Sequence, residues 1–140
     1  MTPVRNEKLL ELIPQRPPFV MIDEFFLDEG QKACSSFQIP NNHFLSINNL
    51  FQEAGLIENI AQTAAAEVGY HCNMNNSKVP TGIIGAVKNL TIDKFPQAGF
   101  TIKTEIIKIA DLSNASKIKG DVFFDHEIIA SAELNIFLIS

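Results

Sequence analysis

The sequence is poor in cysteine, contains no tryptophan and has no long uninterrupted apolar run. Its two cysteines, Cys34 and Cys72, stand far apart and form no CxxC pattern, which argues against a disulfide scaffold. His71 beside Cys72 supplies two ligand types without a third cluster, which is weak support for a metal centre. We therefore predict two free thiols, no bound metal and no cofactor.

Positive charge is also scarce, because 11 basic residues face 16 acidic ones and the net charge is −5. This balance disfavours nucleic acid as a partner. The N-terminus lacks the basic region and apolar run of a signal peptide, and polar residues interrupt the most apolar segment. We therefore expect a cytoplasmic protein without a membrane span.

One third of the chain departs from the acidic average. Between Lys88 and Lys119 there are six lysines and three carboxylates, so this part carries a local charge of +3. These lysines are either ordinary residues of strand surfaces or a docking patch for an acidic partner. His71, His126 and Glu67 are expected to be ordinary surface residues.

The length of 140 residues and the 46% apolar content indicate one globular domain, residues 1–140. The patterns predict helices over 6–13 and 50–69, and strands over 19–27, 32–39, 82–95, 100–112, 115–124 and 127–139. Antiparallel strands with one segregated helix indicate an α+β fold. We expect one curved antiparallel sheet of about six strands wrapped around the long helix, with a sheet edge that pairs with a second chain.

The long helix is the segment that the other elements are expected to surround. Asn49 is predicted as its N-cap, with Gln52 reaching back to it, and Gly69 as its stop. The helix is apolar almost all round, which is typical of a buried helix. Glu58 and Gln62 share one face at i and i+4, and apolar neighbours around Glu58 favour a functional carboxylate over a solvated one.

Four segments resemble the 3-hydroxyacyl-[acyl-carrier-protein] dehydratases. Residues 14–23, PQRPPFVMID, are similar to the opening Pro-His-Arg-x-Pro-Phe-Leu-x-x-Asp, and residues 58–63, ENIAQT, are similar to the helix motif Glu-Ala-x-Ala-Gln. Residues 87–99 and 125–133 resemble a strand with its Pro-x-x-Gly turn and the final hairpin. The resemblance spans nearly the whole chain and implies a hot-dog fold, in a homodimer or in a heterodimer with a related hot-dog protein. The helix motif is also similar to that of dehydratase-like proteins of aryl-polyene or flexirubin-type pigment synthesis.

The resemblance implies loss of water from a 3-hydroxyacyl thioester of an acyl carrier protein or of coenzyme A. His43 would remove the α-proton, and Glu58 would handle the leaving hydroxyl. Backbone N–H groups near Glu53 and Ala54, at the helix start, would hold the developing enolate oxygen. Substrate binding is expected to involve Glu53, Ala54, Gln62 and Arg16 as well.

The loop that carries His43 departs from the family pattern. His43 and Phe44 match the first two letters of His-Phe-Pro-Gly, but Leu45 and Ser46 replace the Pro and the Gly. Glu58 follows His43 by 15 positions, one more than the usual interval, so an ungapped alignment places Phe44 at the base position. A one-residue bulge in the loop would restore the register. The alternative is that His43 is an exposed loop histidine.

Three functions are compatible with these residues. The first is an active dehydratase that uses Glu58 and His43. The second is a thioesterase, in which the helix carboxylate alone activates water or attacks the thioester. The third is a non-catalytic acyl-binding or assembly subunit that pairs with an active relative, which the altered loop favours. We rank the dehydratase first and the thioesterase last.

Overall fold

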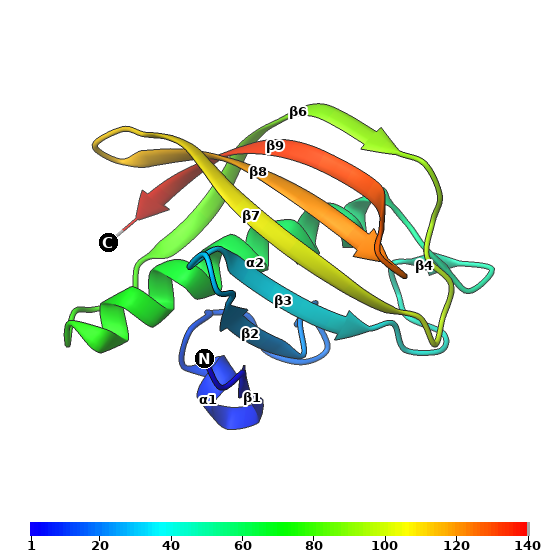
Figure 1. Ribbon diagram of the computed structural model, residues 1–140, viewed down its shortest axis with the longest axis horizontal. Coiled ribbons are helices and arrows are strands. Elements are labelled where there is room, and N and C mark those ends of the chain that lie inside the picture. Colours follow the sequence, from blue (N-terminus) through cyan, green and yellow to red (C-terminus); the bar gives the residue numbers. More distant parts are fainter. Residues whose placement is uncertain (140) are drawn as a thin grey trace.

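A seven-stranded sheet curves around one long helix in the computed structural model, which describes residues 1–139 (Figure 1). In chain order the elements are β1 (Val4–Arg5), α1 (Asn6–Leu10), β2 (Glu24–Leu27), β3 (Ala33–Gln38), β4 (Ser46–Ile47), β5 (Leu50–Phe51), α2 (Glu53–Met74), β6 (Thr81–Ile92), β7 (Thr101–Asp111), β8 (Ala115–Phe124) and β9 (Glu127–Ile139).

The strand order across the sheet is β1-β2-β3-β7-β8-β9-β6, and every neighbouring pair is antiparallel. Strands β4 and β5 form a separate hairpin. Apart from the two-residue β1, the large sheet has six strands, so the predicted α+β fold with about six strands around a long helix is confirmed. The short α1 and the N-terminal strands lie on the opposite side of α2 from the upper part of the sheet (Figure 1).

The core lies between α2 and the concave face of the sheet. Alternate strand positions such as Ile102 and Leu134 are fully buried there, together with Leu56 and Ile60 of α2. Gly120 of β8 lets Ile60 approach the sheet, because a Cβ at Gly120 would overlap the Ile60 side chain. Close contact between helix and sheet therefore depends on a glycine in the strand.

The predicted start of the long helix is wrong. Asn48 and Asn49 both have left-handed backbone conformations, with φ angles of 51° and 61°, and they form the turn between β4 and β5. Asparagine tolerates this region better than most residues, which explains why the turn forms here. The helix begins at Glu53 with Gln52 as its N-cap, and Gln52 makes no side-chain capping bond.

The predicted stop at Gly69 is also wrong, because α2 continues to Met74. A Cβ at position 69 would overlap the backbone carbonyl of Leu12. The glycine therefore allows the segment after α1 to pack directly on the helix backbone, and it does not end the helix.

The strand predicted over 19–27 begins only at Glu24. Between Phe19 and Met21, side chains of α2 take up the backbone groups that a strand partner would otherwise use. Gln62 accepts from the Met21 N–H at 2.6 Å and donates to the Phe19 carbonyl at 2.9 Å, and Asn59 donates to the Met21 carbonyl at 2.8 Å. Smaller differences shorten the first helix to 6–10 and the next strand to 33–38, whereas β8 and β9 have their predicted bounds.

Both cysteines are free thiols, as predicted, and His71 and His126 are exposed. Glu67 is only partly exposed, so its assignment as an ordinary surface residue is wrong. Within residues 1–139, no three His, Cys, Asp or Glu side chains gather into a group that could hold a metal ion. Over the same residues, none of the helices combines the length and the apolar character that a membrane span requires.

Candidate functional site

A cavity of about 830 Å³ lies between α1, the segment 17–23 and the loop 40–44. Its volume is within the usual range of small-molecule sites. The wall is mainly apolar and aromatic, and it includes Leu9, Phe19, Val20, Phe37, His43 and Phe44. The cavity is therefore suited to an extended apolar ligand, with one ionisable imidazole in its lining.

His43 is held in place by aromatic rings and by its own loop. Its ring stacks on Phe44 with 4.7 Å between centroids, and it meets the edges of Phe51 at 5.2 Å and Phe37 at 6.3 Å. Its Nδ1 accepts the backbone N–H of Leu45 at 3.0 Å. Burial lowers the pKa of His43 below the ordinary value of 6.5. The alternative of an exposed loop histidine does not hold, because the imidazole is half-buried and packs against three aromatic rings.

The aromatic cluster also brings His43 close to the start of α2. Phe51 is fully buried, and its ring covers Gly55 in the first turn of the helix, where a Cβ would overlap it. Because His43 lies against the same Phe51 ring, the loop and the helix start share one packed unit. The hairpin β4–β5, absent from the predicted elements, is what positions this ring.

Glu58 is half-buried, and Gln62 donates a hydrogen bond to its Oε2 at 3.0 Å. The predicted sharing of one helix face by these two residues is thus confirmed. Gln62 is completely buried, and its amide also binds the backbone at Phe19 and Met21. In this arrangement Gln62 orients Glu58 and fixes the cavity wall at the same time.

A buried polar network lies one residue further along α2. Thr104 donates to Asn59 at 2.5 Å, Thr63 donates to the Asn59 carbonyl at 2.7 Å, and Ser35 meets Thr63 at 2.6 Å. All four side chains are fully buried. Asn59 and Thr63 were not among the predicted site residues, although they have the same i, i+4 spacing as Glu58 and Gln62.

Glu53 and Ala54 are the first two residues of α2, and both are exposed. The first backbone N–H groups of a helix have no acceptor within the helix, and they lie at the positive end of its dipole. This helix end is therefore able to bind an oxygen that carries negative charge. Arg16, by contrast, is outside the cavity lining; its guanidinium donates to the Ile13 and Gln15 carbonyls at 3.0 and 2.7 Å.

The structure does not place Glu58 and His43 in the lining of the same cavity, because Glu58 is outside the set of residues that form the wall. The two are linked through packing. Gln62 joins Glu58 to Phe19, Phe19 meets Phe44 edge-to-face at 5.5 Å, and Phe44 stacks on His43. The two candidate catalytic residues therefore lie at opposite ends of one chain of contacts.

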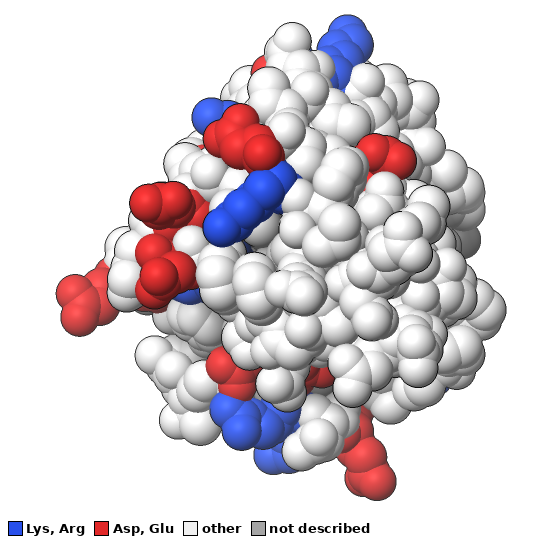
Figure 2. Space-filling model, turned by 90° about the vertical axis from the view of Figure 1, so that its right-hand side faces the viewer, with Lys and Arg blue, Asp and Glu red and all other residues white. Residues whose placement is uncertain are grey.

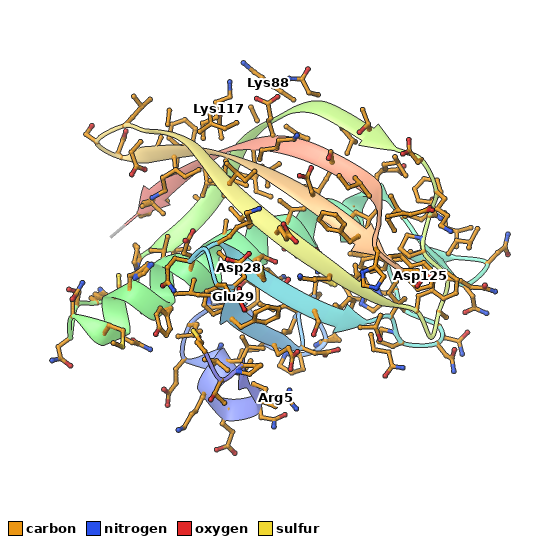
Figure 3. The ribbon with its side chains drawn as sticks, in the orientation of Figure 1. Arg5, Asp28, Glu29, Lys88, Lys117 and Asp125 are labelled. Atoms are coloured by element: carbon orange, nitrogen blue, oxygen red, sulfur yellow. The ribbon has the colours of Figure 1, made fainter. Side chains whose placement is uncertain are left out.

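The lysines between positions 88 and 119 do not form a patch of unbalanced positive charge. Most belong to exposed ion pairs, which are Lys103–Glu105, Lys108–Asp111, Lys117–Glu133 and Lys119–Asp121. Lys88 and Lys117 project from the outer face of the sheet (Figure 3). Among residues 1–139, Lys88 and Lys94 are the two lysines of this segment without a carboxylate within 4.0 Å.

The end of the molecule that carries the β4–β5 hairpin has a broad area without charged side chains (Figure 2). Phe19, Phe44, Ile47 and Leu50 are large apolar side chains of this region that remain exposed in the single chain. Exposed apolar area of this kind is typical of binding surfaces.

Comparison with known proteins supplies the context for this site. The sequence profile of the ApeP-like family, described as ApeP dehydratase, matches residues 7–140. The chain is 23% identical to the 3-hydroxyacyl-[acyl-carrier-protein] dehydratase FabZ of Methylobacterium nodulans, an alignment that covers 95% of this chain and 87% of the relative.

Two solved structures show the same fold. The dehydratase heterocomplex ApeI:P of Xenorhabdus doucetiae contains a chain with a TM-score of 0.80 and 13% identity, covering 97% of this chain and 93% of that one. A hypothetical thioesterase protein with coenzyme A from Streptococcus pneumoniae has a TM-score of 0.60 and 10% identity, covering 78% and 79%. The fold expected from the sequence, the hot-dog fold, is thereby confirmed.

Proposed function

The chain belongs to the ApeP-like dehydratase family, and from this premise we propose that it removes water from a 3-hydroxyacyl thioester of an acyl carrier protein to give the trans-2-enoyl thioester. Three relatives that are 21–23% identical to this chain carry the name 3-hydroxyacyl-[acyl-carrier-protein] dehydratase FabZ, which describes this reaction. The proposal assigns Glu58 and His43 as the catalytic residues.

The observation that carries this proposal is the aromatic cavity with His43 in its wall. An acyl chain needs an apolar channel, and this cavity of about 830 Å³ has the volume and lining for one. His43 is the ionisable ring in that lining that contacts both Phe44 and Phe51. A thioester at the mouth of the cavity would lie between this ring and the start of α2.

The start of α2 would bind the thioester oxygen. The backbone N–H groups of Glu53 and Ala54 are at an exposed helix N-terminus, where positive potential stabilises an oxyanion. Glu58 lies one turn further along the same helix, and its carboxylate is oriented by Gln62. The helix would thus offer its first N–H groups to the cavity of its own chain and its Glu58 carboxylate to the cavity of a second chain.

We further propose that a second chain completes the site, because the cavity beside His43 does not include Glu58. Strand β6 is at the edge of the large sheet, and it exposes Ile83, Val87 and Leu90 to 49%, 38% and 39%. An edge strand with apolar side chains is suited to antiparallel pairing with another chain. Glu58 of one chain would then approach the cavity of the other.

The carrier protein would dock through the few cations that are not already neutralised. Within residues 88–119, Lys88 and Lys94 are the lysines without an ion pair, and we assign the docking role to them together with the exposed Arg16. A double variant, Lys88→Glu with Lys94→Glu, is expected to raise the KM for a carrier-protein substrate and to leave the KM for a short coenzyme A substrate unchanged. Equal KM values for wild type and variant on the carrier-protein substrate would contradict this docking surface.

The decisive experiment is turnover of 3-hydroxyacyl and enoyl thioesters with aliphatic, aryl and polyene chains. Wild type is expected to interconvert the two, and His43→Ala and Glu58→Ala are each expected to lower kcat/KM by about 10²-fold or more. Glu11→Ala, at an exposed position after α1, is the matched control. Release of free acid and thiol in place of the enoyl thioester would identify a thioesterase.

The second candidate function is a non-catalytic acyl-binding subunit of a heterocomplex. The support for it is the structural likeness to a chain of the ApeI:P dehydratase heterocomplex and the departure of the His43 loop from the family pattern. It predicts binding of acyl thioesters, measured by calorimetry, without turnover of any substrate by the isolated protein. Measurable turnover by wild type would exclude this candidate.

A further inference from the structure

The departure from the family pattern at position 45 changes the hydrogen bonding of His43. The Leu45 N–H donates to Nδ1 of His43 at 3.0 Å, and the Ser46 N–H donates to the His43 carbonyl at 3.0 Å. A proline at position 45, as in the pattern His-Phe-Pro-Gly, has no N–H to donate. The leucine therefore supplies a bond that the family pattern cannot make.

This bond fixes the tautomer of the imidazole. A neutral imidazole carries one N–H, and a nitrogen that accepts a hydrogen bond is the unprotonated one. With Nδ1 accepting from Leu45, the proton of neutral His43 is assigned to Nε2. In this tautomer Nε2 is a donor, and it has no free electron pair with which to accept a proton from a substrate.

The surroundings also oppose the protonated ring. An imidazolium has an N–H at both nitrogens, so its Nδ1–H would face the Leu45 N–H. The rings of Phe37, Phe44 and Phe51 add no compensating negative charge, and burial lowers the pKa of His43. Both effects favour the neutral form of the side chain.

We propose that His43 acts as a neutral hydrogen-bond donor through Nε2–H, and that the Glu58 carboxylate is the base that removes the α-proton. This inference rests on the proposed dehydratase function and reverses the division of labour that the family resemblance implies. His43 donates to the substrate oxygen on which negative charge develops, together with the N–H groups at the start of α2.

The atoms and electrons of the elimination balance with one carboxylate. Glu58 takes the α-proton, and the electron pair of the broken C–H bond forms the double bond to the β-carbon. The bond from the β-carbon to the hydroxyl oxygen breaks, and the departing oxygen takes the proton back from Glu58 to leave as water. The carboxylate is regenerated, and His43 neither gains nor loses a proton.

The tautomer is testable without any turnover. Two-bond ¹⁵N–¹H correlation spectra of the wild-type protein resolve three histidines at most, and His43 is assigned by the signal lost in His43→Ala. The expected pattern at pH 7.5 is the Nε2–H tautomer. A Nδ1–H tautomer, an averaged pattern or an imidazolium at this pH would overturn the proposal.

A matched pair of variants tests the cause. Leu45→Ala keeps the N–H and is expected to keep the Nε2–H tautomer, whereas Leu45→Pro removes the N–H and is expected to abolish the preference. An unchanged tautomer in a folded Leu45→Pro protein would overturn the assigned role of this bond. If Leu45→Pro does not fold, as judged by circular dichroism, the wild-type spectrum still decides.

Kinetics of glutamine and alanine variants test the role in catalysis. The amide nitrogen of glutamine occupies about the place of Nε2 and donates, but it cannot serve as a base. We expect His43→Gln to retain activity within about 10-fold of wild type and His43→Ala to lose about 10²–10³-fold. An equal loss of activity in His43→Gln and His43→Ala would overturn the role of His43 as a hydrogen-bond donor. A silent wild type that shows the Nε2–H tautomer would instead refute the proposed dehydratase function and leave the tautomer assignment standing.

Discussion

Glu67 shows how the position of one carboxylate on α2 changes its chemistry. It is half-buried near Lys108 and His71, and burial raises its pKa from the usual 4.5, while these two cations act in the opposite direction. Asp111 adds a further upward contribution, although Lys108 and Asp111 are themselves paired at 3.1 Å. Glu67 is therefore a carboxylate that the native state holds at a cost when it is charged.

This shift predicts a pH-dependent stability effect. The pKa of Glu67 is higher in the native state than in the unfolded state, so at pH values between the two the native state binds the proton more tightly. The free energy of unfolding therefore falls as the pH rises through this range. Glu67→Gln removes this titration, and we expect it to stabilise the protein at pH 7.5 and to have no such effect near pH 4. Urea unfolding at both pH values measures the difference. Glu11→Gln, at an exposed site, is the control, and an equal gain at both pH values would contradict the explanation.

Burial also distinguishes the reactivity of the two thiols. Cys34 is completely buried in β3, and burial raises its pKa to about 11, whereas Cys72 is half-buried near the end of α2. Because the thiolate is the reactive form, we expect a disulfide reagent at pH 8 to modify Cys72 and to leave Cys34 unmodified in the native protein. Both should react in urea. Rapid native-state modification of Cys34 in a Cys72→Ser variant would contradict this expectation.

At the scale of elements, Gln62 connects the helix to the cavity wall. It is completely buried, and it makes hydrogen bonds to Phe19, Met21 and Glu58. Methionine has a similar length, but Gln62→Met leaves two backbone groups, the buried Met21 N–H and the partly buried Phe19 carbonyl, without their partners. We expect a loss of about 2–4 kcal/mol in the free energy of unfolding, since each unsatisfied buried group costs about 1–3 kcal/mol.

The same variant should also lower activity, because Glu58 loses the amide that orients it. Chemical denaturation and turnover under folding conditions measure the two effects separately. Gln97→Met, at an exposed position, is the control for the substitution itself. If Gln62→Met is as stable as the wild type, the hydrogen bonds from Gln62 to Phe19 and Met21 do not contribute to holding the segment 19–21 against α2.

The elements that the sequence predicted well are the long strands that turn residues separate. Strands β8 and β9 have the predicted bounds, and the alternating positions Ala130, Ala132, Leu134 and Ile136 of β9 are buried in the core. The start of α2 was missed because Asn49 suits both an N-cap and a left-handed turn, and only pairing of β4 with β5 selects the turn. The role of Gly69 was missed because the overlap with Leu12 involves a residue distant in sequence.

The candidate site was predictable to a lesser extent. The i, i+4 spacing of Glu58 and Gln62 was enough to find a contact at 3.0 Å. The aromatic enclosure of His43 was not predictable, because Phe37 and Phe51 come from separate strands that only the tertiary structure brings together. The bond from Leu45 to Nδ1 depends on loop geometry, for which the residue types alone give no signal.

At the scale of the whole molecule, the edge strand β6 is the surface through which we propose that two chains pair into a dimer. Val87 lies near its middle and is 38% exposed. We expect Val87→Asp to convert a dimer into monomers, since a charge at an apolar interface is costly to bury. Ile107→Asp, on the interior strand β7 and 44% exposed, is the control. Sedimentation velocity gives the masses, and a Val87→Asp protein that remains dimeric would place the interface elsewhere.

The assembly also decides how the catalytic pair is formed. Glu58 is outside the cavity that His43 lines, so the site is expected to take His43 from one chain and Glu58 from the other. In a dimer of one His43→Ala chain and one Glu58→Ala chain, one of the two sites then has both wild-type residues. Random mixing of the two inactive proteins should restore about a quarter of the wild-type activity, because half of the dimers are mixed and each has one intact site.

The mixing experiment separates two arrangements that single variants cannot distinguish. If both residues act within one chain, every site in a mixed dimer carries one substitution, and mixing restores no activity. The two variants are unfolded and refolded together so that the subunits exchange, and each is also refolded alone as a control. A protein that combines His43→Ala and Glu58→Ala in one chain, mixed with wild type, provides the second control. If the sites are shared between chains, the mixed dimers of this double variant with wild type are inactive, because each site has lost either His43 or Glu58. If each site lies within one chain, half of the sites in those dimers remain active.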